Sequence, residues 1–267
     1  MEKYGGTLIH KSRDLFGDIE VVDHEETRSL YFGSHIKQSS MWLDRPNVLA
    51  LRYTEGMMAS LLIQPNPKRI LLLGLGAGSL AKFYYHHFPK CQITIVECSD
   101  KVVKVAHGYF HLPEDDRIQI VHQDAALYLY SIGQRLSETF DHICVDLFSA
   151  DGPATVLYAP KFFAICRSML TERGVLTSNL WATDKVLFDG LAKEILQQFS
   201  NNALFFTMKD YGNVIGMGLV GSLNPAQKKK LSGLSKALSL AYGFDFSDFV
   251  KEMQNNNKDW FKASNDV

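Results

Sequence analysis

Short apolar runs alternate with longer segments of helical spacing through the middle of the chain. The runs have the length of strands and are rich in Ile, Val and Leu, and they lie at 69–73, 92–97, 117–122, 140–147 and 174–181. The segments between them have the apolar spacing of helices, and they lie at 79–88, 100–110, 125–135, 154–170 and 184–199. Apolar strands separated by helices predict a mostly parallel sheet that is covered by helices on both faces.

The pattern before this region is different. Residues 18–23 and 28–33 alternate between polar and apolar side chains on either side of a polar turn, which is typical of an antiparallel hairpin. Residues 53–62 then have helical apolar spacing, and the Gln-Pro-Asn-Pro sequence that follows ends this helix. We therefore predict a small N-terminal β-rich domain over 1–63 and a second domain over 64–267.

The pattern after residue 199 indicates how the sheet ends. Apolar runs at 203–208 and 213–220 flank a turn-like spacer and predict an antiparallel hairpin that closes the sheet. This ending favours a class I methyltransferase-type fold over a purely parallel dehydrogenase fold. The tail from Asn224 is predicted to be helical, with fraying over about its last ten residues. The predicted fold class is therefore α/β, a class I S-adenosylmethionine-methyltransferase-like Rossmann sheet with a small N-terminal antiparallel β domain.

Composition narrows the class of protein. The chain has 267 residues, of which 46% are hydrophobic, and its net charge of −1 provides no general attraction for nucleic acid or an anionic membrane. No segment approaches the ~20 apolar residues needed to cross a bilayer, and no signal peptide is predicted. The four cysteines lack C-x2-C spacing and are interpreted as reduced core residues, which favours a cytoplasmic protein. His107 and His111 have no acid or cysteine pattern beside them, so no metal site is predicted.

The first apolar strand ends in glycines at every second position, Gly74, Gly76 and Gly78. Glycines permit backbone angles closed to other residues and close approach of a ligand, and the next helix begins at the same crevice. The second strand ends in Glu97, where an α/β nucleotide fold holds the two ribose hydroxyls. The G-x-G-x-G spacing departs from the dinucleotide pattern and favours a single nucleoside of the S-adenosylmethionine type over NAD.

Three further polar residues follow strands, at the edge where ligands bind in open α/β sheets. Asp124 is predicted to contact the adenine amino group, although a helix cap is the alternative reading for Asp124 and for Glu97. Asp146 precedes a loop rich in turn formers and is predicted to accept a proton or hold a cation beside a reactive carbon, with a structural Asx-turn as the alternative. Asn179 ends the fifth predicted strand, and Trp181 beside it either flanks the ligand or packs in the core.

With these residues, the chain resembles the spermidine synthase (polyamine aminopropyltransferase) family over residues 15 to 221. The loop from Asp146 to Ala154, Asp-Leu-Phe-Ser-Ala-Asp-Gly-Pro-Ala, is similar to the family pattern Asp-Ser-Ser-Asp-Pro-x-Gly-Pro-Ala. The sequence Tyr-Thr-Glu-Gly at Tyr53 resembles the family's Tyr-(His/Gln)-Glu-Met, and Tyr211 resembles a later family tyrosine. Gln38 resembles the N-terminal glutamine that reaches the nucleoside.

The resemblance implies transfer of an aminopropyl group from decarboxylated S-adenosylmethionine to a small-molecule amine. It assigns the deprotonation of the amine to Asp146 and places Tyr53 and Tyr211 along the amine channel, where the alternative for each tyrosine is a packed ring with a hydrogen-bonded hydroxyl. It also implies a homodimer formed through the N-terminal β domain.

Several residues depart from the family pattern. Ala77 stands where the family's Gly-Gly-Gly-Asp-Gly-Gly loop has its aspartate, Ser149 replaces the second acid of the later loop, and Thr54 replaces the His or Gln beside the tyrosine. Negative charges are therefore missing where a dication binds, and each is worth roughly 1–4 kcal/mol. The acids that could compensate are Glu55, Asp151 and Asp210.

Three functions remain open at this point. The first is an aminopropyltransferase-like enzyme with an altered amine or nucleoside preference. The second is an S-adenosylmethionine-dependent methyltransferase on the same fold, because Ala77 no longer repels the methionine carboxylate. The third is a binding or oligomerisation module that keeps a nucleoside pocket without turnover.

Overall fold

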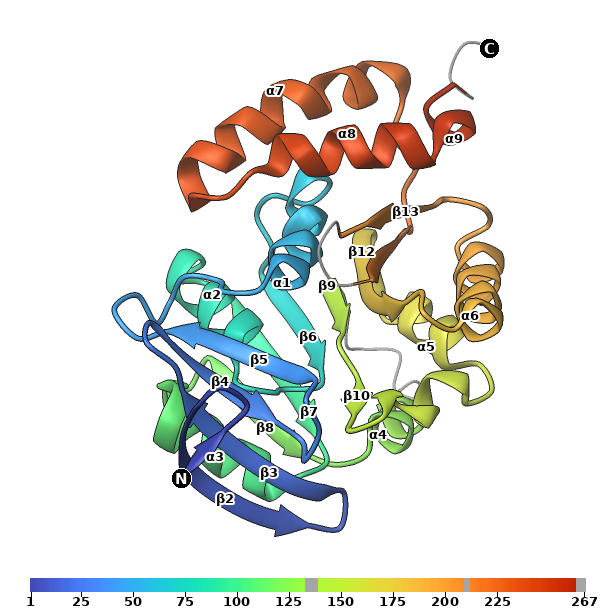
Figure 1. Cartoon of the computed structure of the whole chain (residues 1–267). Helices are drawn as coiled ribbons and strands as arrows, with labels where there is room; N and C mark the ends of the chain where they lie inside the picture. Colours follow the sequence, from blue (N-terminus) through green and yellow to red (C-terminus); the bar gives the residue numbers. More distant parts are fainter. Residues whose placement is uncertain (133–138, 209–211, 263–267) are drawn as a thin grey trace.

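A seven-stranded mixed sheet forms the centre of the protein. The computed structural model describes residues 1–132, 139–208 and 212–262. The strand order is β13-β14-β12-β9-β6-β7-β8 (Figure 1). The strands are β6 (Arg69–Leu73), β7 (Gln92–Glu97), β8 (Ile118–His122), β9 (Phe140–Val145), β12 (Leu170–Trp181), β13 (Ala203–Thr207) and β14 (Asn213–Leu219). The strands from β8 to β12 pair in parallel, and β13 and β14 are antiparallel, as the sequence predicts.

The apolar composition of β6 is explained by its position. Ile70 and Leu72 belong to the core on one face of the sheet, whereas Leu71 and Leu73 belong to the core on the other. Because side chains alternate along a strand, a strand covered on both faces needs apolar residues at every position. The helices that follow the parallel strands are α2 (Ser79–His87), α3 (Asp100–Phe110), α4 (Ala125–Ile132), α5 (Phe162–Ser168) and α6 (Lys185–Gln198).

The predicted helix over 154–170 is wrong. This stretch contains a short 3₁₀ turn, η2 (Thr155–Tyr158), then the break at Pro160, then α5, and β12 already begins at Leu170. Ala159 has an extended backbone because the residue before a proline is disfavoured in the helical region. The two-stranded ladder of β10 (Phe148–Ser149) and β11 (Gly152–Pro153) precedes the turn and shapes the loop after β9.

The N-terminal part is a five-stranded antiparallel sheet in the order β1-β2-β3-β4-β5. The strands are β1 (Glu2–Lys3), β2 (Gly6–Asp14), β3 (Gly17–Asp23), β4 (Thr27–Tyr31) and β5 (Lys37–Trp42). The predicted hairpin corresponds to β3 and β4, and the sequence pattern missed β1, β2 and β5. This sheet packs against α2 and α3, so that it lies beside the carboxyl-terminal edge of the central sheet (Figure 1).

Helices cover the end of the molecule opposite the N-terminal sheet. The predicted helix over 53–62 is α1 (Arg52–Met57) followed by η1 (Met58–Leu62). Above it lie α7 (Pro225–Tyr242), α8 (Phe246–Asn256) and α9 (Lys258–Lys262), so the predicted fraying is wrong for 258–262 (Figure 1). Within the described residues, no helix combines the length and apolar character needed to cross a membrane.

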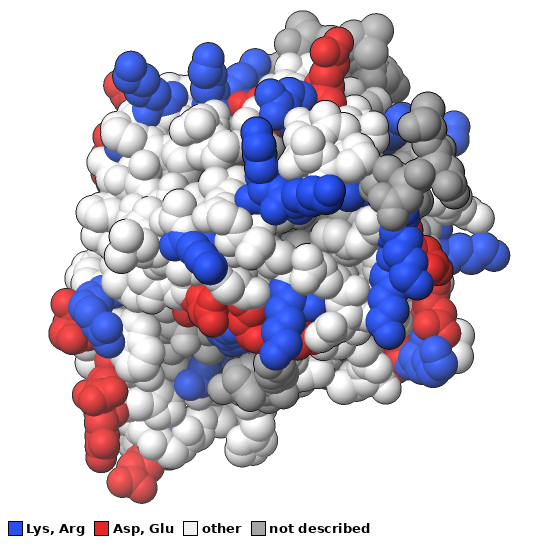
Figure 2. All heavy atoms as spheres, turned by 90° about the horizontal axis from the view of Figure 1, so that it is seen from above, with Lys and Arg blue, Asp and Glu red and all other residues white. Residues whose placement is uncertain are grey.

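The surface over the C-terminal helices is not a continuous basic patch. Lys228, Lys229 and Lys230 lie on α7, and Figure 2 shows Lys and Arg side chains on this face separated by uncharged surface and by acids. Lys229 and Lys230 are exposed, whereas the ammonium of Lys228 lies 4.0 Å from the centre of the Trp260 ring.

Candidate active site

A cavity of about 650 Å³ lies where the carboxyl ends of β6, β7 and β9 meet the N-terminal sheet. Seven of the predicted site residues line it, namely Gln38, Tyr53, Gly74, Gly76, Glu97, Asp124 and Asp146. Gly78 is not among the lining residues, and Tyr211 lies outside the described residues. Residues predicted from separate motifs, up to about a hundred positions apart in the chain, therefore share one cavity.

The glycine loop is required by packing within the protein as well as by any ligand. Gly74 has φ +95°, and a Cβ atom at this position would lie 2.2 Å from the backbone oxygen of Asp146. Gly76 has φ +54°, and its Cβ position lies 3.1 Å from Oγ of Ser39 on β5. Both conformations disfavour residues with side chains. The loop is therefore held against the end of β9 on one side and the N-terminal sheet on the other.

Glu97 ties the glycine loop to the end of β7. Its carboxylate accepts hydrogen bonds from the backbone N–H of Leu75, at 3.1 Å, and of Ser99, at 2.9 Å. Burial raises the pKa of Glu97 above its ordinary value, and these backbone hydrogen bonds oppose that rise by stabilising the charged form. The carboxylate is thus fixed at the cavity wall, at the position predicted for ribose recognition.

Asp124 is exposed and acts as a helix cap, which is the alternative that the sequence left open. Its Oδ1 accepts the backbone N–H groups of Ala126, at 2.9 Å, and Leu127, at 3.1 Å, in the first turn of α4. Asp124 also lines the cavity. Capping and ligand contact are compatible, because a carboxylate has two oxygens with several acceptor positions.

Asp146 is a buried acid in the cavity, and its pKa lies well above the ordinary value for aspartate. Its Oδ1 accepts a hydrogen bond of 2.9 Å from Nδ2 of Asn179, and its Oδ2 accepts one of 3.2 Å from the hydroxyl of Tyr53. Burial raises the pKa of Asp146 to about 6, against the opposing effect of these two hydrogen bonds. A carboxylate with such a pKa is ionised near neutral pH and is basic enough to accept a proton.

Asn213 extends this network and was not predicted from the sequence. Its Nδ2 donates to Oδ1 of Asn179 at 2.8 Å, which orients the Asn179 amide so that its NH₂ group faces Asp146. Asn213 is the first residue of β14, an antiparallel strand. The expectation that ligands meet the carboxyl ends of parallel strands gives no signal for a residue at the start of such a strand.

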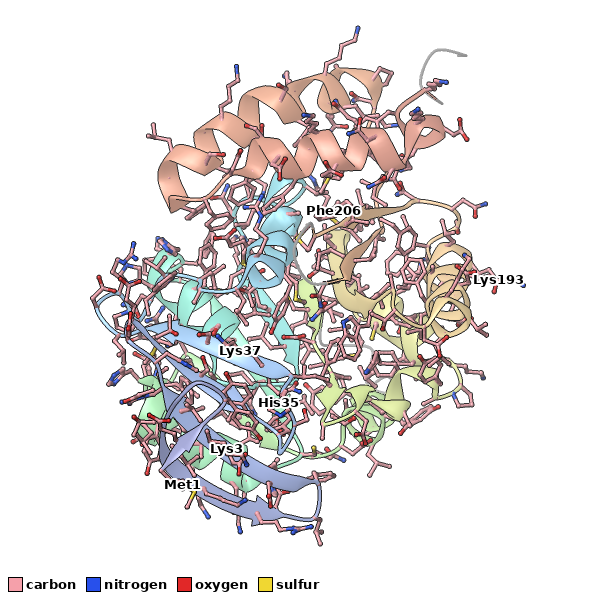
Figure 3. All side chains as sticks on the ribbon, in the orientation of Figure 1. Met1, Lys3, His35, Lys37, Lys193 and Phe206 are labelled. Atoms are coloured by element: carbon pink, nitrogen blue, oxygen red, sulfur yellow. The ribbon has the colours of Figure 1, made fainter. Side chains whose placement is uncertain are left out.

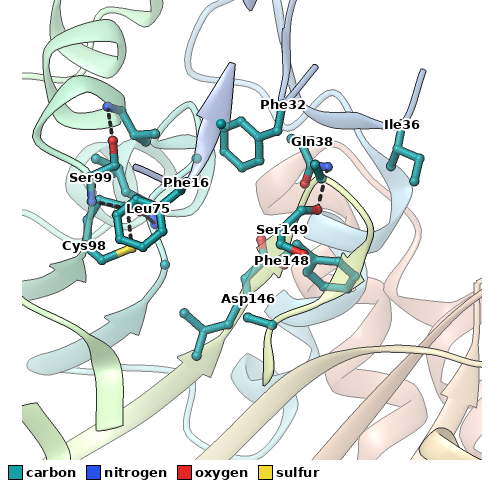
Figure 4. A pocket seen from close by; sticks show the side chains of 18 of the residues that line it. Phe16, Phe32, Ile36, Gln38, Leu75, Cys98, Ser99, Asp146, Phe148 and Ser149 are labelled. Atoms are coloured by element: carbon teal, nitrogen blue, oxygen red, sulfur yellow. Dashed lines mark hydrogen bonds between the residues drawn. The ribbon is translucent and has the colours of Figure 1, made fainter. Parts of the chain in front are cut away.

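The N-terminal sheet is fastened to the loop after β9 across the cavity. Gln38 donates from Nε2 to the backbone oxygen of Ser149 at 3.3 Å (Figure 4), and the hydroxyl of Ser34 donates to the backbone oxygen of Ala150 at 3.1 Å. The hydroxyl of Tyr53 lies 3.1 Å from the backbone oxygen of Gln38 and 3.2 Å from Oδ2 of Asp146, so its single proton serves one of these acceptors at a time.

Aromatic rings form much of the remaining wall. Phe16 and Phe32 come from loops of the N-terminal sheet, Phe148 comes from β10 (Figure 4), and Trp181 comes from the end of β12. The Phe148 and Trp181 rings meet edge to face, with centroids 6.1 Å apart. Trp181 therefore lines the cavity and also packs against Phe148. The two interpretations of this residue, ligand contact and packing, are compatible. Phe16 lies in the turn between β2 and β3, and Phe32 follows β4, and both were missed because strand periodicity gives no signal for residues outside the strands.

Two departures from the family pattern, Ala77 and Thr54, lie away from the cavity lining, whereas Ser149 is part of it. Ala77 is completely buried and does not line the cavity, and the hydroxyl of Thr54 donates to the backbone of Leu51 at 2.6 Å. Glu55 pairs with Arg52 at 2.9 Å, and Asp151 is exposed, and neither lines the cavity. Asp210 lies outside the described residues. Of the described acids considered as replacements, none reaches the cavity.

Comparisons with known proteins show the family to which the chain belongs. The model of the spermine/spermidine synthase domain matches residues 51–223. The chain belongs to this family. The predicted resemblance to spermidine synthases is thus confirmed. A polyamine aminopropyltransferase of Chromobacterium violaceum is 32% identical over 251 residues, which cover 94% of each chain.

Solved structures similar to this spermine/spermidine synthase family member confirm the predicted fold class. A spermidine synthase in complex with the transition state analogue AdoDATO is similar with a TM-score of 0.70 and 18% identity, over 96% of this chain and 88% of that one. Human methyltransferase-like protein 13 in complex with SAH is similar with a TM-score of 0.62 and 22% identity, over 77% of this chain and 93% of that one. Among the described residues, no group of three or more His, Cys, Asp or Glu side chains is arranged to hold a metal ion.

Proposed function

We propose that this protein is a transferase that moves an aminopropyl group from decarboxylated S-adenosylmethionine to a small-molecule amine, as in polyamine biosynthesis. The observation that carries the proposal is the buried Asp146 carboxylate, whose pKa is raised to about 6, in a cavity shared with the glycine loop and Glu97. Membership of the spermine/spermidine synthase family supports the same reaction.

In this proposal, one group of residues binds the donor nucleoside and another lines the channel for the amine acceptor. Glu97 binds the ribose hydroxyls, Asp124 binds the adenine amino group, and Gly74 and Gly76 let the donor approach the backbone. Gln38 joins the N-terminal sheet to the donor end, and Gly78 directly precedes α2, whose N-terminus faces the donor. Tyr53 and Tyr211 line the amine channel.

Asp146 supplies the chemistry at the acceptor. An alkyl amine is mostly protonated near pH 7, and only its neutral form attacks carbon. Asp146 holds the amine and accepts the proton that it loses, while the amine nitrogen bonds to the propyl carbon and the carbon–sulfur bond breaks to release methylthioadenosine. Tyr53 and Asn179 orient the carboxylate through their hydrogen bonds to its two oxygens.

The rate is expected to rise with pH through about 6, because Asp146 accepts a proton only when it is ionised. Below this value kcat/KM should fall about tenfold for each pH unit. The profile of kcat/KM between pH 5 and 9 measures this, and a profile without an inflection between pH 5 and 7 would contradict the assignment.

The free energy of unfolding should fall as the pH rises from 4 to about 6, whereas the rate should rise with pH. The pKa of folded Asp146 lies above its ordinary value of 3.8, so the folded chain binds more protons than the unfolded chain between pH 4 and about 6. Asp146 therefore destabilises the fold as pH rises through this window. Asp146→Asn should show a smaller loss of unfolding free energy from pH 4 to 6 than the natural protein, as measured by urea unfolding.

A methyltransferase on the same fold is the second candidate. It is favoured by Ala77, which provides no carboxylate to repel the carboxylate of S-adenosylmethionine. Calorimetric titration with methylthioadenosine and S-adenosylhomocysteine distinguishes the two candidates. The aminopropyltransferase should bind methylthioadenosine. Binding of S-adenosylhomocysteine alone would favour methyl transfer, and binding of neither would reject both.

The remaining assignments belong to the same proposal. We propose an N-terminal β-rich domain over 1–63, a nucleoside-binding domain over 64–267, and a cytoplasmic homodimer that binds neither nucleic acid nor membrane. Sedimentation of the purified protein tests the dimer. Any turnover that depends on Asp146 would eliminate the alternative of a binding module without activity.

A further inference from the structure

Two buried amides connect β14 to the Asp146 carboxylate. Asn213 donates from Nδ2 to Oδ1 of Asn179 at 2.8 Å, and Asn179 donates from Nδ2 to Oδ1 of Asp146 at 2.9 Å. Both asparagines line the cavity, although only 8% of Asn213 and 3% of Asn179 are exposed. An ionised carboxylate only accepts hydrogen bonds, so Asn179 must present its NH₂ group to Asp146 and its oxygen to Asn213. The Asn213 amide therefore supports the orientation of Asn179 that suits an ionised Asp146.

The register of the sheet places Asn213 beside Asn179. Asn213 pairs with Trp181 in the antiparallel ladder of β12 and β14, so its side chain lies on the same face as Trp181 and as Asn179, two residues earlier. β13 holds β14 from its other side, and the buried Phe206 of β13 packs against Phe249 of α8 with ring centroids 6.0 Å apart. Figure 3 shows Phe206 beneath the C-terminal helices. The sheet itself therefore fixes the position of Asn213.

The two oxygens of Asp146 differ in the freedom of their donors. Oδ2 lies 3.2 Å from the Tyr53 hydroxyl, which can donate instead to the backbone oxygen of Gln38 at 3.1 Å. Asn179 cannot turn away from Oδ1 in this manner, because its NH₂ group would then meet the NH₂ group of Asn213 unless both amides turned together. Oδ2 can therefore be released to a substrate while Oδ1 stays occupied.

We propose that Asn213 is a positioning residue for proton transfer, because through Asn179 it keeps Oδ1 of Asp146 occupied and leaves Oδ2 to take the proton of the amine. This inference rests on the proposed function and refines it. The Tyr53 hydroxyl then donates to Gln38, which opens Oδ2 to the amine. An N–H bond of the amine breaks as the O–H bond at Oδ2 forms. The electron pair left on nitrogen attacks the propyl carbon, and the electrons of the carbon–sulfur bond leave with methylthioadenosine.

The Asn179 amide also affects the acidity of Asp146. Burial raises the pKa of Asp146 to about 6, and the hydrogen bond from Asn179 acts against this rise. Among the described residues, the titratable groups that act on Asp146 are Tyr53 of α1 and Cys144 of β9, and no charged side chain pairs with it. Burial raises the pKa of Tyr53 well above its ordinary value and that of Cys144 to about 11, so neither obscures the titration of Asp146.

The experiment measures the titration of Asp146 in the full-length protein and compares it with the pH profile of the reaction. Asn213→Val removes the donor and keeps a residue suited to a strand. The carboxyl signal of Asp146, observed by ¹³C NMR and identified by its absence in Asp146→Asn, should titrate about one pH unit higher in Asn213→Val, because Asn179 can then turn its oxygen towards the protonated acid. The acid limb of kcat/KM should move equally, which lowers kcat/KM about tenfold at pH 5.

A double-mutant cycle separates a role through Asn179 from general loosening of the sheet. Asn179→Val should also raise the pKa of Asp146, and adding Asn213→Val to it should have no further effect, because the same contact is already lost. The matched control is Asn202→Val. Asn202 donates to the backbone oxygen of Leu219 at 2.9 Å, at the other end of β14, and does not line the cavity. Its loss should lower the melting temperature and leave both titrations unchanged.

Three results would overturn the role of Asn213. They are an Asp146 titration that is unchanged in Asn213→Val, an equal shift in Asn202→Val, and shifts that add in the double variant. If Asn213→Val does not fold, Asn213→Ala removes the same donor without added bulk and is measured in its place. A shifted titration in a protein whose natural form transfers no aminopropyl group would reject the proposed function alone. Transfer with an unshifted titration would reject the role of Asn213 alone.

Discussion

Asp146→Asn is expected to lower kcat by about 10³-fold, because positioned proton acceptors contribute 10²–10⁴-fold to such reactions. Asparagine has nearly the same shape, but its amide does not accept a proton from the amine. The binding of methylthioadenosine should change by less than about threefold, since its ribose and base contact other residues in the proposed arrangement. The measurement is single-turnover aminopropyl transfer at saturating donor, followed by detection of released methylthioadenosine.

The matched control for this substitution is Asp151→Asn in the same loop. Asp151 is exposed and does not line the cavity, so its kcat should remain within about twofold of the natural value. Asp146→Asn should also fold, because replacing a buried carboxylate by a neutral group removes a desolvation penalty. A folded Asp146→Asn protein that keeps a tenth of the natural kcat would exclude Asp146 as the proton acceptor.

Gly74→Ala is expected to have the second largest effect, on the fold and the site together. The added Cβ atom would lie 2.2 Å from the backbone oxygen of Asp146, and neither backbone segment can move without disturbing the sheet. The positive φ of +95° adds strain for alanine. A loss of about 3–5 kcal/mol in unfolding free energy follows, together with the loss of nucleoside binding.

Gly190→Ala is the control for Gly74→Ala. Gly190 lies inside α6, and a Cβ atom there meets nothing within 4 Å. Alanine in an exposed helix should stabilise the protein by about 0.5–1 kcal/mol, so the two glycine substitutions should shift the melting temperature in opposite directions. A melting temperature of Gly74→Ala within about 2 °C of the natural protein would show that the loop tolerates a side chain, contrary to the geometry.

The sequence predicted the central sheet well, because its signals are local. Five apolar runs, the helices between them and the closing hairpin follow from periodicity, and Gly74 and Glu97 mark the ends of two strands. Strand ends of a parallel sheet meet at one edge, so Asp124 and Asp146 could be placed at the cavity without knowing the packing. The single helix predicted over 154–170 was wrong, because Pro160 interrupts the segment. Apolar spacing in so short a segment does not show where one helix ends and the next begins.

The amino-acid sequence by itself thus determined the class of fold, the glycine loop and the acids at the strand ends, since these depend on residues close together in the chain. The tertiary structure alone decided which distant side chains face the cavity. Asn213 aligns the Asn179 amide, Trp181 lines the cavity and packs against Phe148, and Glu55 is held by Arg52 away from the cavity. These facts depend on the docking of the N-terminal sheet and of β14 against β9 and its loop. Such contacts join segments far apart in the chain, and no local periodicity encodes them.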